Sequence, residues 1–276
     1  MVPFAINYKM RKGIVFLLLW GICSCTLAKK RKVSSRVAVL KIEHTGGING
    51  AGVAWDPDHQ IYYAAIAGNS YFPMFMYNAE GKRIGDTTMN TMFDVRGLWY
   101  NTTTKTLQAS GYKSFGLAEY ILGSDLAPES IRKMPIPSRQ PNEQSAAAFD
   151  TGNKVLYFYD SSTGNVIREF FTGSYDTVIL YLGAKHKKRK NEHRNGTVKS
   201  HYNENSCIYT GIKRAEIGLL NAKERQLELY SAKTGLIKYV RKLPSDVPVE
   251  YSLNFSSSNG IYWFFDRKKR EWRGYR

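Results

Sequence analysis

One turn recurs along this chain at a regular spacing, and it constrains the fold more than any other feature. Its clearest copy lies in Val53–Ala65, where Trp55 precedes Asp56 and an Ile-Tyr pair starts the return strand five residues after that aspartate. Four further copies also place a polar residue after an aromatic one. The polar residues are Asp56, Asn101, Asp150, Asn203 and Ser256, at successive gaps of 45, 49, 53 and 53 residues.

Each copy predicts a β-hairpin. The turns are built from Asp, Asn, Ser and Gly, which tolerate turn dihedrals, and the flanks are rich in the aromatic and β-branched residues that suit strands. A second kind of hairpin, centred on a glycine turn, lies between the polar residues in Tyr77–Ile84 and Tyr230–Ile237. Each unit therefore contains two hairpins, or four strands.

Four-stranded units that repeat every 40–50 residues are the sequence signature of a β-propeller. One such sheet cannot bury both of its faces alone, so neighbouring sheets must stack in a ring. The spacing predicts an all-β propeller of about five four-stranded blades. A β-sandwich is the alternative fold, and a sixth blade would require an additional unit around residues 160–200. The segment Pro135–Gln144 is expected to connect the second blade to the third.

The first unit also resembles a known repeat. Gly52–Ala65 followed by Met74–Ile84 is similar to the repeat of NHL and TolB-like bacterial propellers, which runs G-x-A-x-D-P-x-G-x-I-Y-V, then an outer strand, then D-x-x-G. The resemblance is clear in this unit and loose in the other four, and it covers residues 36–276 as architecture. It implies a fold, and this fold hosts many functions.

The two ends of the repeat region predict how the ring closes. Arg36–His44 alternates like a strand but has no partner turn, whereas the last unit is one strand short. We therefore expect Val37–Ile42 to pair with Glu271–Tyr275 as the outermost strand of the last blade, which removes the open seam of the ring. This assigns residues 36–276 to one propeller domain.

Residues 1–28 carry the pattern of an export signal. Lys9, Arg11 and Lys12 precede the apolar run Gly13–Cys23, which is short for a membrane span. The sequence Ile-Cys-Ser-Cys that ends at Cys25 is similar to the lipobox of bacterial lipoproteins. This resemblance implies acylation of Cys25 and a lipid anchor at the periplasm or outer membrane. The alternatives are ordinary secretion after cleavage near Ala28 and a signal anchor.

The net charge of +17 is concentrated in basic runs. Lys29–Lys32 lies in an expected basic linker, residues 29–35, where its charges would attract anionic headgroups. Lys185–Lys190 reads as a loop tip, and Arg267–Arg270 as a third run. The loop lacks the interleaved aromatic residues of a single-strand nucleic-acid groove, so no nucleic-acid partner is expected. A binder of anionic surfaces or nucleic acid is the third functional hypothesis.

Motifs for nucleophilic or phosphate chemistry are missing from the sequence. It contains no GxSxG, GxxxxGK[ST] or GxGxxG motif. Its five histidines form no HExxH motif, and no cysteine pair has metal-ligand spacing. No metal site and no cofactor are therefore expected under the first hypothesis, and the catalytic residues of any enzyme are unknown.

The candidate ligand-binding residues lie where inner strands are expected to start. Asp94, Glu143 and Glu250 hold equivalent places in three blades and would face one axial cavity, and Arg96 would line its mouth. An Arg fork suits an anionic ligand. Propeller lactonases bind a divalent cation at the ring axis through residues of inner strands, and the enzyme alternative would place such a cation on these carboxylates. The alternative is that each carboxylate is a strand-edge charge in water.

The first functional hypothesis is an exported, envelope-associated propeller that acts as a non-catalytic binding or scaffold module. Its partner would be an envelope protein or a glycan, and its membrane contact would be the lipid anchor. The alternative is a propeller enzyme, either a metal-dependent lactonase-like protein or a glycan-acting hydrolase or lyase.

Overall fold

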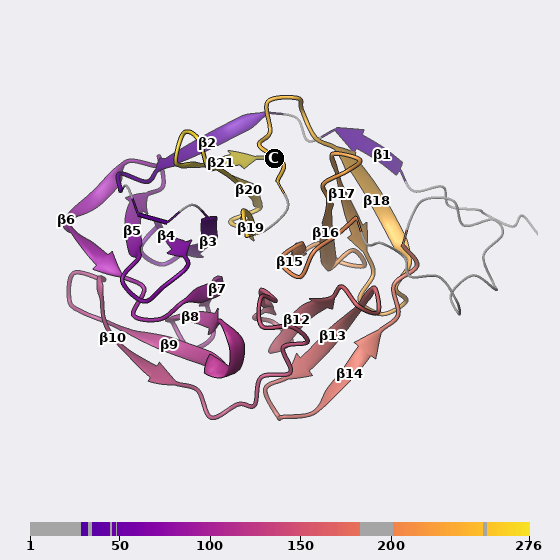
Figure 1. The fold of residues 1–276 in the computed structure, drawn as a ribbon, viewed down its shortest axis with the longest axis horizontal. Helices are drawn as coiled ribbons and strands as arrows, with labels where there is room; N and C mark the ends of the chain where they lie inside the picture. Colours follow the sequence, from indigo (N-terminus) through magenta and orange to yellow (C-terminus); the bar gives the residue numbers. More distant parts are fainter. Residues whose placement is uncertain (1–28, 33–34, 45, 48, 183–200, 251–252) are drawn as a thin grey trace, which may run out of the picture.

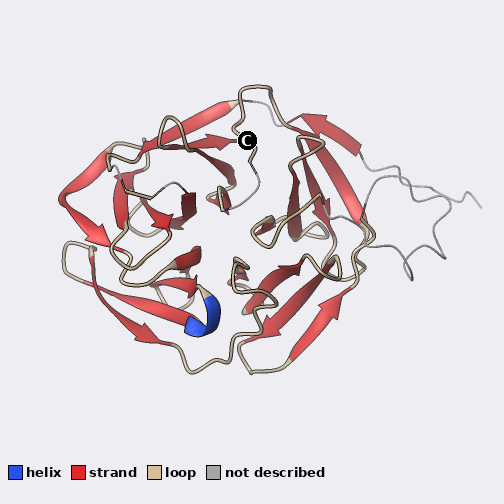
Figure 2. Ribbon diagram, viewed as in Figure 1, coloured by secondary structure: helices blue, strands red, loops and turns tan. Residues whose placement is uncertain are grey.

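The computed structural model describes residues 29–32, 35–44, 46–47, 49–182, 201–250 and 253–276. These residues form five β-sheets arranged in a ring around one axis (Figure 1). Figure 2 shows strands throughout the ring and one short 3-10 helix, η1 (Lys113–Phe115), among the described residues. The chain is a five-bladed β-propeller. The predicted fold and its similarity to propeller repeats are confirmed, and the sandwich and six-bladed alternatives are wrong.

In the first four blades, the four strands follow one another in chain order from the axis outward, and in the fifth blade β2 takes the outermost position. The first and second blades contain β3 (Asn49–Asp56), β4 (Ile61–Ala67), β5 (Pro73–Asn78) and β6 (Arg83–Asn90), then β7 (Val95–Asn101), β8 (Thr106–Gly111), β9 (Leu117–Leu122) and β10 (Pro128–Lys133). The third and fourth contain β11 (Ala148–Asp150), β12 (Val155–Asp160), β13 (Asn165–Phe170) and β14 (Tyr175–Val178), then β15 (Cys207–Tyr209), β16 (Ile217–Asn221), β17 (Gln226–Tyr230) and β18 (Ile237–Lys242). The fifth contains β19 (Phe255–Ser258), β20 (Ile261–Asp266), β21 (Glu271–Tyr275) and β2 (Arg36–Lys41).

The recurring turn has a common geometry. Its first residue is Asp or Asn, whose side-chain oxygen accepts backbone N–H groups two or three residues later, as Asp56 does from Asp58 at 2.9 Å. Its fifth residue has a positive φ, for example 57° at Gln60. The same arrangement closes the turns that begin at Asn101, Asp150, Asn221 and Asp266. The side chain thus replaces a backbone partner in five turns.

Two of the expected turn positions are wrong. Asn203 lies in the connection before β15, where its side chain accepts the Asn205 N–H at 2.9 Å. Ser256 lies inside β19, and its Oγ accepts the Val53 N–H of the first blade at 3.0 Å. The inner hairpin of the fifth blade turns at Asn259-Gly260, both with positive φ, which is the geometry of a type I′ turn.

The ring closes through its amino-terminal strand, as expected. β2 pairs antiparallel with β21, with Leu40 opposite Trp272, and the Ile42 N–H donates to the Arg270 carbonyl at 2.8 Å (Figure 1). Leu40 and Trp272 are fully buried. Closure therefore pairs the strand that precedes the first blade with the last strand of the chain in one sheet.

The first half of the expected basic linker, residues 29–32, forms a strand in the structure. Lys29–Lys32 forms β1, a fifth strand of the fourth blade, which pairs in parallel with β18. The predicted signal of residues 1–28, with Cys25, and the basic run Lys185–Lys190 lie outside the described residues. Among the described residues, no helix has the length and apolar character needed to cross a bilayer.

The hydrophobic core is divided among the joints between blades. Five clusters of buried residues each combine side chains from two neighbouring sheets. At the joint between the fifth and first blades, Tyr62 meets Trp263 edge to face, with ring centroids 5.2 Å apart. Because every blade buries both faces against its neighbours, the loss of one joint exposes two sheets.

Candidate functional site

The five inner strands begin at one face of the ring, which we call the start face. Asp94 directly precedes β7, and Arg96 is the second residue of that strand, so both side chains lie at this face, where they bind each other. Arg96 is 5% exposed, and its guanidinium binds the Asp94 carboxylate in a two-pronged ion pair, with Nη2 2.9 Å from Oδ2. Asp94 also accepts the Gly68 N–H at 2.8 Å. Both partners of this pair are therefore satisfied within the protein.

Three residues from two loops complete the Arg96 cluster, which we define as Asp94, Arg96, Tyr112, Glu143 and Gln144. The Arg96 guanidinium stacks on the Tyr112 ring at 4.7 Å, and its Nε donates to Gln144 Oε1 at 3.0 Å. The Tyr112 hydroxyl donates to Glu143 at 2.7 Å, and this bond raises the pKa of Tyr112. The fold thus brings together three of the four residues that the sequence singled out.

The fourth residue, Glu250, belongs to a different group. It lies in the connection from β18 to β19, and its carboxylate pairs with Arg267 at 3.1 Å. The expected set of three converging carboxylates is therefore not formed. Whether any of the four residues binds a ligand stays a prediction.

The ring axis offers little space. An axial cavity of about 70 Å³ is lined by the inner strands and by Arg96. This volume is well below the roughly 300–1,000 Å³ of typical small-molecule pockets. The inner strands approach so closely that a Cβ on Gly97 would lie 2.6 Å from the Ala147 carbonyl.

In the described part of the chain, the axis has neither a reactive thiol nor a cluster of metal ligands. Burial raises the pKa of the Cys207 thiol, which lines the axial cavity, to about 12, so this side chain is a neutral thiol at physiological pH. Within the described ranges, no group of three or more His, Cys, Asp or Glu side chains is placed to hold a metal ion.

A larger hollow, which we call the groove, lies beside the Arg96 cluster on the start face. It has a volume of about 580 Å³ and runs between η1 and the connection from β10 to β11. Its apolar lining consists of Phe115, Leu117, Met134, Ile136, Pro137 and Pro141. Its polar lining consists of Lys113, Ser114, Ser138, Gln140, Asn142 and Glu143.

Local chemistry explains why the groove forms here. The Met134 N–H donates to the Leu117 carbonyl at 2.9 Å, and the Lys113 N–H donates to the Glu143 carbonyl at 3.2 Å, so the connection is held at both ends. Between these bonds it contains Pro135, Pro137 and Pro141, which have no N–H group to continue a sheet ladder. The connection therefore arches away from blade two. The sequence predicted the connection but not the groove beneath it.

A buried carboxyl group, that of Glu169, binds the backbone of the connection that forms one wall of the groove. Glu169 on β13 is fully buried, and its Oε2 accepts the Arg139 N–H at 2.8 Å. Its Oε1 has no hydrogen-bond partner in the described part of the chain. Burial raises the pKa of Glu169, and the bond from Arg139 opposes this rise in part.

This carboxyl group predicts a pH dependence of stability. The folded protein keeps the Glu169 proton to a higher pH than the unfolded chain does, so the free energy of unfolding should fall as pH rises from about 4 into the neutral range. We expect Glu169→Gln to remove this slope, measured by urea unfolding between about pH 4 and about pH 8. Glu129→Gln, a change at an exposed position on β10, is the control and should keep the slope. Parallel curves for wild type and Glu169→Gln would contradict the prediction.

Comparison with known proteins supports the fold and no specific function. No family model matches the sequence, and no curated protein is similar to it. Among solved structures, glutaminyl cyclase from Myxococcus xanthus is similar with a TM-score of 0.52 and 11% identity over 88% of this chain and 95% of that chain. A structural genomics protein from Bacteroides thetaiotaomicron gives a TM-score of 0.49 and 13% identity over 90% and 74%. A streptogramin B lyase gives 0.39 and 9% over 84% and 68%. At these identities the similarity shows the propeller fold alone.

Proposed function

We propose that this chain is an exported propeller that acts as a non-catalytic binding module at the cell envelope and holds a segment of a partner protein in the groove. The observation that carries this proposal is the groove itself, which is about eight times larger in volume than the axial cavity, 580 against 70 Å³. Loops on a stiff scaffold are the usual place for ligand contacts in such folds. The sequence pattern of residues 1–28, which is typical of an export signal, supports the location at the envelope.

The lining of the groove favours a peptide over a sugar. Its apolar lining includes Phe115 and Pro137, while the exposed side chains of Lys113 and Glu143 bring opposite charges to it. The Phe115 ring is stacked on Phe93, with ring centroids 4.1 Å apart, and Lys133 Nζ lies over the ring at 4.6 Å from its centroid, so the ring offers a ligand an edge and not a free face. An apolar side chain flanked by backbone amides fits these contacts better than a sugar ring, which stacks on open aromatic faces.

The groove wall also contains unsatisfied polar atoms. Ser138 Oγ and Gln140 Oε1 are buried and have no hydrogen-bond partner among the residues described. Each such atom costs about 1–3 kcal/mol.

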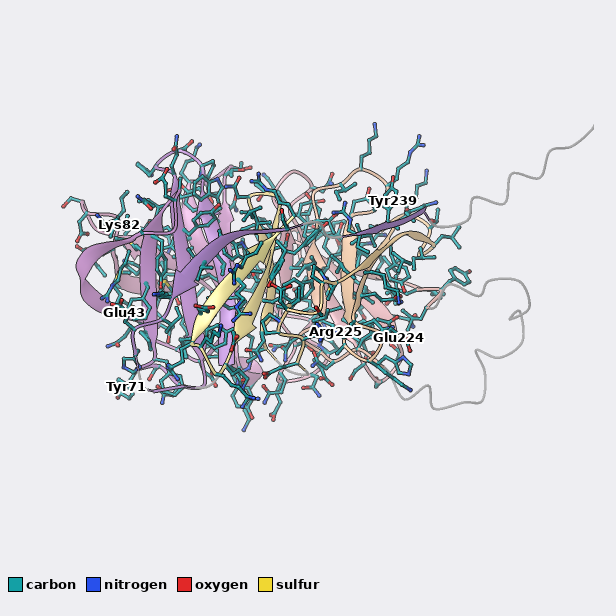
Figure 3. The ribbon with its side chains drawn as sticks, turned by 90° about the horizontal axis from the view of Figure 1, so that it is seen from above. Glu43, Tyr71, Lys82, Glu224, Arg225 and Tyr239 are labelled. Atoms are coloured by element: carbon teal, nitrogen blue, oxygen red, sulfur yellow. The ribbon has the colours of Figure 1, made fainter. Side chains whose placement is uncertain are left out.

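A photo-crosslinking experiment tests the proposal. A benzoyl-phenylalanine at Ser114, an exposed position on the groove, should crosslink to a discrete protein partner in intact envelopes. The same probe at Lys82, which lies on a distant turn (Figure 3), should not. Pro137→Glu should reduce the crosslink at least about 10-fold by placing a charge in the apolar lining of the groove. Pro57→Glu, a matched change at an exposed turn, should leave it intact.

Two outcomes would contradict the proposal of a peptide-binding module. A crosslinked product that is glycan and contains no protein would replace the peptide with a sugar ligand. The enzyme alternative predicts instead that a divalent cation raises the melting temperature of the purified protein and that candidate lactones or glycans are turned over. Heat stabilisation by the cation together with turnover would overturn the proposal.

A further inference from the structure

The outer rim between the third and fourth blades exposes a group of large apolar side chains. Ile179 is 58% exposed, Tyr181 is 42% exposed and Leu236 is 40% exposed. These residues adjoin, because the Tyr181 N–H donates to the Gly235 carbonyl at 3.0 Å and a Cβ on Gly235 would meet the Ile179 carbonyl. Single exposed apolar residues are ordinary, whereas a group of three marks an interaction surface. We call these three residues the rim patch.

Basic residues lie in one of the two chain segments that form the rim patch, and acidic residues are missing from both. The segments 177–182 and 229–245 contain no Asp or Glu, and the second carries Lys233, Lys238 and Lys242. It also carries Arg241, whose guanidinium lies 5.3 Å from the centroid of the Tyr262 ring in blade five. The carboxylate just before the first segment, Asp176, is bound by Arg168, with Nε 2.6 Å from Oδ1. Apolar and aromatic side chains beside a run of lysines match the boundary of an anionic bilayer.

The strand β1 adds a second independent observation. Its four basic residues pair in parallel with Tyr239–Lys242, so that Arg31 lies opposite Arg241 and Lys32 opposite Lys242. The backbone register thus places four consecutive basic residues of the sequence, Lys29–Lys32, at the outer edge of blade four. A concentration of Lys and Arg at one edge favours contact with an anionic surface.

The direction of β1 links this edge to the amino terminus. Because Lys29 pairs with Tyr239, the chain enters β1 beside the end of β18 that follows Leu236 (Figures 1 and 3). The apolar run Gly13–Cys23 and the expected lipid position Cys25 immediately precede β1 in the sequence. An anchor in that segment would hold the rim patch close to the bilayer.

We propose that the outer edge of blade four, composed of the rim patch, β1 and the basic residues of β18, docks directly on an anionic phospholipid bilayer. In this orientation the outer edge of the fourth blade would face the bilayer. The groove, which lies between η1 of the second blade and the connection to the third, would stay open to a partner. This surface is distinct from the groove, and each of the two proposals can fail alone.

The test uses the full chain and vesicles of phosphatidylcholine with or without phosphatidylglycerol, measured by cosedimentation. All variants keep the amino-terminal segment, so its contribution cancels in the comparison. Ile179→Glu combined with Leu236→Glu should weaken partitioning to the anionic vesicles at least about 10-fold, since the change removes two apolar contacts and adds two negative charges. Tyr71→Glu combined with Ile121→Glu adds the same charge at exposed positions on blades one and two and should leave partitioning unchanged. Tyr71 lies at the opposite side of the ring from Tyr239 (Figure 3).

A second measurement keeps the proposal falsifiable if the double variant folds poorly. In the wild-type protein, anionic vesicles should slow hydrogen exchange in 233–242 and leave exchange around Tyr71 unchanged. Equal partitioning of the two double variants, or no slowing in 233–242, would overturn the proposal. Binding to soluble heparin without binding to anionic vesicles would also overturn it, because it would assign the edge to a polyanion.

Discussion

Leu40→Asp should lower the free energy of unfolding by about 5 kcal/mol, which is the largest effect expected from a single substitution in this protein. Leu40 is fully buried in β2, opposite Trp272, within the cluster that joins the fifth blade to the first. The change removes an apolar side chain from the only strand that links the amino terminus of the ring to its last blade in the described chain, and it buries a charge. Urea unfolding followed by tryptophan fluorescence measures the loss.

Val37→Asp is the matched control for this substitution. Val37 lies on the same strand but is 46% exposed, so the same new charge should cost less than about 0.5 kcal/mol. Similar losses for the two variants would show that β2 is sensitive along its whole length and would contradict the role of Leu40 in closure.

Glu228→Ala should cost about 3 kcal/mol through the loss of a buried acceptor. Glu228 is 1% exposed on β17 and receives hydrogen bonds from Tyr202 at 2.7 Å and from Tyr230 to one oxygen. Its other oxygen receives bonds from Gln226 at 2.7 Å and Asn221 at 3.1 Å. The variant removes the acceptor that four donors share and leaves a cavity inside the fourth blade. Thermal and urea unfolding measure the effect.

Two comparisons separate the causes of this loss. Glu228→Gln keeps the volume and one acceptor oxygen, so it should cost only about 1–2 kcal/mol. Glu224→Ala changes an exposed carboxylate four residues earlier (Figure 3) and should be nearly neutral. A loss for Glu224→Ala as large as that for Glu228→Ala would argue against the buried hydrogen-bond network as the cause.

The fold was predictable because its signals are local and repeated. The turn at Asp56 follows from its own sequence, since an Asp side chain accepts the N–H two residues on and aromatic strands flank it. Ring closure followed from a strand without a turn at one end and a missing strand at the other. The turns of blades four and five were misplaced because Asn203 and Ser256 also follow aromatic residues. The true positions, Asn221 and Asp266, close the next hairpin outward.

The site was less predictable because it depends on contacts between loops. Asp94 and Arg96 are neighbours in sequence, so their proximity was readable, but their ion pair with each other depends on the orientation that the loop gives them. Glu250 occupies the expected place before an inner strand, yet Arg267 from another turn binds it. The groove arises where a proline-containing connection crosses η1, and only the cluster of prolines after β10 signalled it in the sequence.

Hydrogen exchange at the Ile42 amide tests ring closure most directly. This amide directly follows β2 and donates to the Arg270 carbonyl at 2.8 Å, across the junction between β2 and the last hairpin. If β2 is an integral strand of the fifth blade, Ile42 should exchange only with global unfolding, at the same free energy as the amides of β20. Rapid exchange of Ile42 while β20 stays protected would show that the ring is stable without its amino-terminal strand.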